Sequence, residues 1–197
     1  MEIFKDKKTC IPASRKDWRK WLEKHHASET AVFLVLFHQR STNHNLTYAE
    51  AVEEALCFGW IDSVAYKRDT ESNYQLYTPR KPKSKWSKSN RERVEKLSAQ
   101  GLMRPAGQAM VDLARETGTW LALEAVENLI IPDDLRAALK RNQTAAKHFD
   151  SFPRSSKRVI LEWIQNAKKP ETRVQRIKKT VELARDNIRA NHPKPKS

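Results

Sequence analysis

One short stretch constrains the fold more than any other part of the chain. The apolar residues Ala-Leu-Cys-Phe at 55–58 are followed by Gly59 and then directly by Trp60, Ile61 and Asp62. A glycine after an apolar helical segment is typical of a helix C-terminus, because glycine adopts a left-handed backbone freely. The alternating residues that follow indicate a β-strand. The sequence therefore predicts a helix that passes into a strand through a single glycine.

The residues around this joint predict a mixed N-terminal region. Thr47 and Glu50 have the spacing of a capping box, which marks the start of the helix before Gly59. A second helix is expected from Ser14, its cap, to His26. Strands are expected at 31–38, 61–67 and 74–78, with 69–73 as the hairpin loop between the last two. We expect an α+β fold with a small, mainly antiparallel three-stranded sheet packed by helices.

Beyond a Pro-, Ser- and Lys-rich break at 79–88, the pattern is helical to the end of the chain. Further helices are expected at 90–100, after Pro105, after Pro132, at 144–150, after a cap at Ser155 or Ser156, and over a final stripe of Val174, Ile177, Val181, Ala184 and Ile188. We predict an α+β N-terminal region at 1–125, a helical C-terminal module at 126–190 and a flexible tail at 191–197.

The charge of the chain predicts attraction to anions. Lys and Arg number 38 against 24 Asp and Glu, a formal net charge of +14. Residues 80–104 hold nine basic and two acidic residues, as do residues 154–179. An anionic partner (nucleic acid, a phosphorylated ligand or an acidic protein) and a solvated surface without a partner are both open. The polyanion-binding candidates, with Trp86 between them, are Lys81, Lys83, Lys85, Lys88 and Arg91.

Motifs for several common chemistries are missing from the sequence. It has no CxxC, no HExxH, no GxSxG, no Walker A motif and no GxGxxG. We therefore expect no metal site and no cofactor, and we assign no catalytic residue. No apolar run reaches the length of a membrane span, and the N-terminus has no signal-peptide core. These features favour a cytoplasmic protein without an integral membrane segment; the sequence gives no oligomeric state.

The predicted hairpin suggests one ligand site. Pairing of its strands would bring Asp62 near Thr78 and Arg80, with Trp60 and Trp86 as walls. An arginine fork matches a carboxylate or a phosphate, so these residues could form a pocket for a small anion. Alternatively, Asp62 and Arg80 form a structural ion pair and both tryptophans belong to the core.

Several of these runs resemble a known bacterial family, the YdeI/OmpD-associated or bacteriocin-protection family. The similar stretches are 46–52, 54–62, 77–80, 86–90, 101–103 with 106–107, 137–149, 163–169 and 171–177. The resemblance as a whole covers about Trp18 to Leu183. The resemblance implies a role in resistance to bacteriocins or cationic peptides and an association with an outer-membrane porin. It implies no reaction and no catalytic residues. Because the chain is itself cationic, protection would be indirect.

Two hypotheses follow. The first is a non-enzymatic stress-resistance protein whose basic surface binds an anionic partner. The alternative is an enzyme acting on a small anionic substrate in a cleft around Asp62 and Arg80. Asp62 would then be the acid or base, Arg80 the anion clamp, and Tyr48 or Tyr77 an auxiliary donor.

Overall fold

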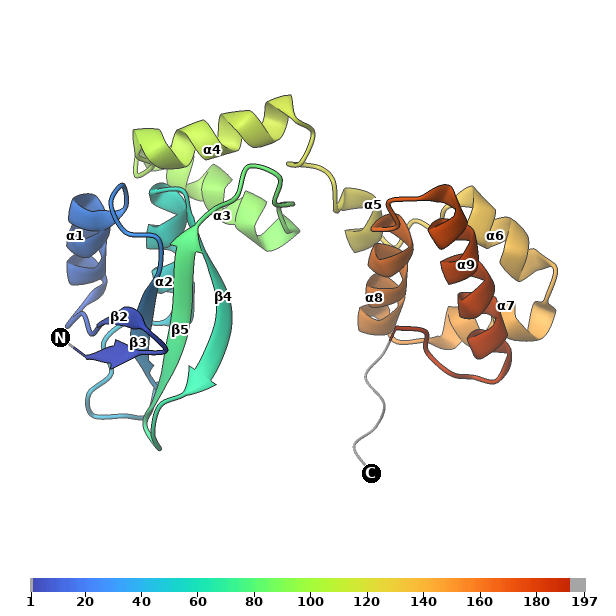
Figure 1. Cartoon of the computed structure of the whole chain (residues 1–197), viewed down its shortest axis with the longest axis horizontal. Coiled ribbons are helices and arrows are strands. Elements are labelled where there is room, and N and C mark those ends of the chain that lie inside the picture. Colours follow the sequence, from blue (N-terminus) through green and yellow to red (C-terminus); the bar gives the residue numbers. More distant parts are fainter. Residues whose placement is uncertain (1, 192–197) are drawn as a thin grey trace. The chain divides into compact units, whose positions relative to one another are not determined.

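The computed structural model describes residues 2–191 and divides the chain into two compact units, Met1–Leu121 and Ala122–Ser197 (Figure 1). Each unit has a hydrophobic core of its own. The predicted flexible tail at 191–197 lies, apart from residue 191, outside the described residues. Among the described residues, none of the helices combines the length and the apolar character needed to cross a membrane.

Unit 1 is an α+β domain, as its sequence predicts. Its elements in chain order are β1 (Ile3–Phe4), β2 (Lys7–Cys10), α1 (Arg15–His25), β3 (Val32–Phe37), α2 (Tyr48–Cys57), β4 (Trp60–Lys67), β5 (Ser72–Pro79), α3 (Lys88–Ala99) and α4 (Pro105–Glu116). The strands form one sheet in the order β1-β2-β3-β5-β4. The capping box at Thr47 is present, and Ser14 caps α1.

The prediction of a mainly antiparallel three-stranded sheet was wrong in its number of strands. The sheet has five strands and is mixed, because β2 pairs with β3 in parallel while the other neighbours are antiparallel. β1 and β2 were missed for a physical reason. They have two and four residues, and the turn between them places Lys5 and Asp6 at positive φ instead of using glycine.

The strand β3 is covered on both faces of the sheet. On one face, Val32, Leu34 and Tyr77 are fully buried in a core with Trp18 of α1. On the other face, Phe4 of β1 stacks on Tyr74 with ring centroids 4.1 Å apart. Burial on both faces explains why β3 is a continuous apolar run rather than an alternating one.

The predicted joint at Gly59 is a point of close packing. Gly59 has φ +74°, and its carbonyl oxygen accepts a hydrogen bond of 2.8 Å from Arg80 N. Gly107 of α4 lies against the end of α2, where an added Cβ would be 2.2 Å from the carbonyl oxygen of Cys57. That oxygen also accepts a 3.0 Å bond from Arg104 N. A side chain at position 107 would separate α4 from α2.

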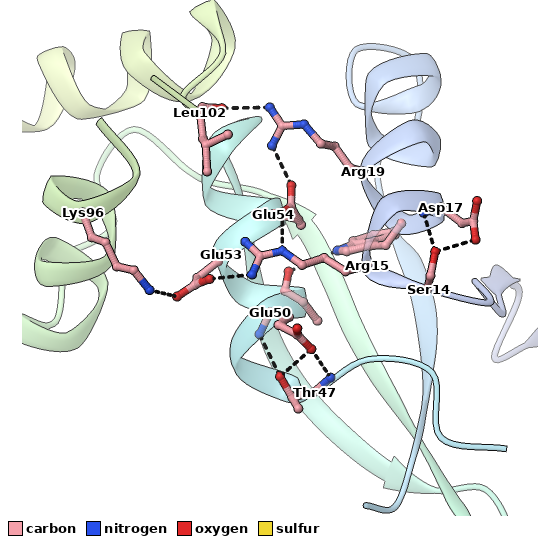
Figure 2. A network of polar contacts seen from close by, with 12 residues as sticks. Ser14, Arg15, Asp17, Arg19, Thr47, Glu50, Glu53, Glu54, Lys96 and Leu102 are labelled. Carbon is pink, nitrogen blue, oxygen red and sulfur yellow. Dashed lines mark hydrogen bonds and ion pairs between the residues drawn. The ribbon is translucent and has the colours of Figure 1, made fainter. Parts of the chain in front are cut away.

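A buried carboxylate joins the helices of unit 1 (Figure 2). Glu54 of α2 is 3% exposed and receives Arg15 Nε and Arg19 Nη1 at 2.6 Å each. Arg19 Nη2 also donates to the Leu102 carbonyl at 2.8 Å, beyond the end of α3. The neighbouring Glu53 pairs with Arg15 at 3.0 Å and with Lys96 of α3 at 3.6 Å. These contacts fix α1, α2 and α3 to one another.

Unit 2 is helical throughout. It contains α5 (Glu124–Glu127), α6 (Asp133–Lys140), α7 (Gln143–Ser151), α8 (Arg154–Gln165) and α9 (Pro170–Arg185) around a core that includes Leu135, Phe149, Ile160 and Ile164. Two details of the prediction were wrong. Pro153 stands at the N-cap of α8 in place of Ser155 or Ser156, and Val174 and Ile188 are 65% and 52% exposed instead of buried. α9 ends at Arg185, so the apolar pattern in the sequence continues beyond the end of the helix.

The contact at Gly107 predicts the sign of a substitution. In a helix interior, Gly→Ala alone adds about 1 kcal/mol of stability through helix propensity. Gly107→Ala should instead lose about 2 kcal/mol, because overpacking against the Cys57 carbonyl outweighs that gain. Urea unfolding measures the change. Ala109→Gly, at an exposed position of the same helix, gives the propensity effect alone. A more stable Gly107→Ala protein would contradict the close contact.

The buried carboxylate predicts a second stability difference. Glu54→Gln should lower the free energy of unfolding by about 2–3 kcal/mol, since it removes the buried negative charge that Arg15 and Arg19 share. The control is Glu23→Gln, whose carboxylate is 42% exposed and pairs with Arg104 at 2.7 Å. This change should cost less than about 1 kcal/mol. Equal losses in the two variants would show that burial of Glu54 carries no special weight.

Candidate functional site

Asp62 lies on β4 opposite Tyr77 of β5, and not opposite Thr78 as predicted. Its hydrogen-bond partner is Tyr48, the first residue of α2, whose hydroxyl donates to Asp62 Oδ2 at 2.6 Å. Burial, followed by this bond, raises the pKa of Tyr48 to about 12. The Tyr77 hydroxyl is buried and has no hydrogen-bond partner among the described residues, and desolvation raises its pKa strongly. At neutral pH, the Asp62 carboxylate therefore lies near two tyrosine hydroxyl groups that are both protonated.

Arg80 follows β5 and is 6% exposed. Its guanidinium carbon lies 3.7 Å from the ring centroid of Trp86, and Nη2 donates to the Lys85 carbonyl at 2.6 Å. Desolvation lowers the pKa of Arg80 to about 10, against the smaller attraction of Asp62. Among the described residues, Arg80 and Asp62 form neither a hydrogen bond nor an ion pair, and Arg80 Nε has no hydrogen-bond partner. The arginine fork faces its own loop.

The structure does not gather the other predicted ligand residues around Asp62. Trp60 is 1% exposed and its indole donates to the His26 carbonyl at 3.1 Å. Trp86 is also 1% exposed and packs on Trp120 with centroids 5.0 Å apart. Thr78 pairs with Ile61, one register position from Asp62, and so lies on the opposite face of the sheet. The two tryptophans are core residues, and neither forms the wall of an open cleft.

The segment Lys81–Lys88, which we name the lysine loop, is ordered by several contacts. The Arg80–Trp86 stack spans it, Ser84 N donates to the Lys81 carbonyl at 3.0 Å, and Trp86 N donates to the Thr119 carbonyl at 3.3 Å. Ser87 then caps α3. Arg80 and Trp86 thus hold the loop from beneath.

The predicted polyanion-binding residues differ in how much they face solvent. Lys81, Lys83 and Lys88 are exposed and Lys85 is half-buried. Arg91, on the first turns of α3, is buried at 9% exposure. The surface charge of this segment therefore comes from its lysines.

Neither cysteine has the environment of a nucleophile. Cys57 is fully buried, and desolvation raises the pKa of its thiol. Desolvation also raises the pKa of Cys10 to about 12. Both thiols are protonated at neutral pH. Within residues 2–191, no three His, Cys, Asp or Glu side chains come close enough together to hold a metal ion.

Sequence reasoning missed one concave site. A pocket of about 340 Å³ opens in unit 1 beside the start of α2, and its lining includes His38, His44, Tyr48 and Gln75. The residues come from three strands, one loop and one helix, so no local motif marks them. The signal that the sequence did offer was the relative length of its elements. The helix α2 has ten residues, and the eight-residue strand β5 is long enough to extend past its start.

The fold and these sites define an α+β domain followed by a separate helical module. Residues 10–110 match the family described as "Domain of unknown function (DUF8412)", and the chain belongs to this family. Residues 128–187 match the family described as "Bacteriocin-protection, YdeI or OmpD-Associated". The predicted resemblance to the latter family is thus confirmed for part of the chain. No curated protein and no solved structure matches the chain.

The Tyr48–Asp62 bond predicts a pH-dependent property. In a tyrosinate absorbance titration, Tyr48→Phe should remove a component that ionises near pH 12, above the ordinary pKa of 10.0. Because the folded pKa is the higher one, Tyr48 favours folding below about pH 10, and this contribution is lost as the pH rises towards 12. Asp62→Asn should lower the pKa of Tyr48. Loss of a component near pH 10 in Tyr48→Phe would contradict this environment.

Proposed function

We propose that this is a non-enzymatic binding protein whose lysine loop engages an anionic partner. One observation carries the proposal: the loop is tied down by the buried Arg80–Trp86 stack while Lys81 and Lys83 face solvent. A loop that is already ordered loses little conformational entropy on binding. Lysines on such a loop attract phosphates or carboxylates without needing a shaped cavity.

The enzymatic alternative is less well supported by the geometry. It requires Arg80 as an anion clamp beside Asp62, yet the guanidinium is buried, stacked and bonded to the Lys85 carbonyl. Asp62 accepts the Tyr48 hydroxyl, whose pKa is raised to about 12. A hydroxyl with that pKa is a weak acid and a poor proton donor at neutral pH.

The second family, described as bacteriocin-protection, suggests a biological setting for this binding. A protein with a formal net charge of +14 repels cationic peptides instead of capturing them. If the chain takes part in bacteriocin protection, we propose that it does so through an anionic cellular partner.

The proposal predicts salt-sensitive binding to a polyanion. Fluorescence anisotropy of a labelled single-stranded oligonucleotide should report binding whose log affinity falls linearly with log salt. The Lys81→Glu/Lys83→Glu variant should bind at least about tenfold more weakly at low salt. Its salt slope should be smaller by about 1.4, the value for two lost phosphate contacts on a single strand.

The control has the same change in net charge elsewhere on unit 1. Lys16→Glu/Lys20→Glu alters two exposed lysines of α1 and should leave both slope and affinity much closer to those of the parent protein. Equal losses in the two double variants would mean that overall charge, and not the lysine loop, governs binding. Absence of binding at low salt would remove nucleic acid as the partner.

A further inference from the structure

The missed pocket exists because α2 is shorter than the strands beneath it. α2 has ten residues, about 15 Å of helix, whereas β4 and β5 have eight residues each, about 26 Å of strand. Asn73, Gln75 and Tyr77 share one face of β5 by alternation. Helices bury Tyr77 completely, while Asn73 and Gln75 line the pocket beyond the start of α2. In Figure 1 the hairpin of β4 and β5 extends past the helices of unit 1.

The rim of this pocket is held in place. Asn45 donates from Nδ2 to the carbonyls of Pro12 and Val35, at 3.0 Å each, and accepts from Phe37 N at 3.3 Å. His38 N donates to the Glu71 carbonyl at 2.7 Å. The loop between β3 and α2 is therefore fixed to the sheet at both of its ends. Such a rim does not need to be ordered by the ligand.

The polar groups of the pocket offer both hydrogen-bond donors and acceptors. Gln75 is 6% exposed, and its Nε2 donates to the carbonyls of Ser63 and Val64 at 3.2 and 3.4 Å. This fixes the amide plane, and Oε1 accepts no hydrogen bond within residues 2–191. Asn73 Nδ2 lies 3.2 Å from His38 Nε2, so an amide and an imidazole contact each other in the lining.

The lining also includes the polar residues Gln39, His44 and Thr47, and its remainder is apolar or aromatic. Leu36, Leu46 and Ala65 contribute aliphatic surface, and Tyr48 contributes a ring whose hydroxyl is tied to Asp62 at 2.6 Å. No Asp, Glu, Lys or Arg is among the described residues that line the pocket. Without these four residue types, the lining gives no reason to prefer a cation or a strong anion. Its volume of about 340 Å³ is at the small end of ligand pockets.

We propose that this pocket binds a small, uncharged heteroaromatic molecule with donor and acceptor groups on one edge, as a nucleobase has. The flat body would lie against the Tyr48 ring and the aliphatic floor. The free acceptor of Gln75 and the imidazole of His38 would read its edge, as carboxamides read bases elsewhere. This inference is independent of the lysine loop.

The test uses the full chain and four ribonucleosides, adenosine, guanosine, cytidine and uridine, at millimolar concentration. In ¹⁵N–¹H spectra, at least one of them should shift the side-chain amide signals of Asn73 and Gln75 in a saturable manner. Ala65→Trp, which fills the pocket from β4, should weaken this binding at least about tenfold. The control Ala99→Trp makes the same change at an exposed position of α3 outside the lining, and should bind as the parent does.

Two outcomes would overturn the inference. One is that no nucleoside shifts the two amide signals; the other is that Ala65→Trp and Ala99→Trp have equal effects. The Lys81→Glu/Lys83→Glu variant separates this site from the proposed function. It should keep its nucleoside affinity within about twofold, since the charge change lies outside the pocket.

Discussion

The arrangement of unit 1 depends on the burial of a single carboxylate, that of Glu54. A carboxylate at 3% exposure is stable only when it is paired and hydrogen-bonded. Arg15 and Arg19 meet this need from successive turns of α1, and both approach to 2.6 Å. This requirement sets the rotation of α1 and its position along α2. Arg19 also holds the Leu102 carbonyl, so the same charge fixes the chain where α3 ends.

Both proposed sites lie at the margins of this framework. The lysine loop leads directly into α3, which Lys96 ties to Glu53 of α2 at 3.6 Å. Beneath the loop, the Arg80–Trp86 stack and the Gly59 carbonyl anchor its start. The pocket lies at the other end of α2, where the capping box at Thr47 ends the helical cover of the sheet. The helical layer thus leaves the lysine loop at one end of α2 and the pocket at the other end.

Local signals in the sequence predicted much of this fold. The glycine joint, the capping box at Thr47 and the hairpin were each readable within about ten residues. The parallel pairing of β2 with β3 was not, because it joins short strands through a helix and depends on distant partners. The burial of Arg80 could not be predicted from the sequence either. An arginine in a lysine-rich segment is expected at the surface, and only the structure shows that it stacks on the buried ring of Trp86. The pocket could not be predicted because it depends on the relative lengths of α2 and the strands. The ends of helices and strands can be predicted from a sequence only to within a few residues.

The most direct test of this account is a double-mutant cycle in urea unfolding between Arg19 and Glu54, using Arg19→Met and Glu54→Leu. Each single change leaves a charge that has lost a buried partner, while the double change removes both charges. We predict that the double variant is more stable than additivity allows, by at least about 1.5 kcal/mol. Additive effects within about 0.5 kcal/mol would contradict the claim that this buried carboxylate holds the helices together.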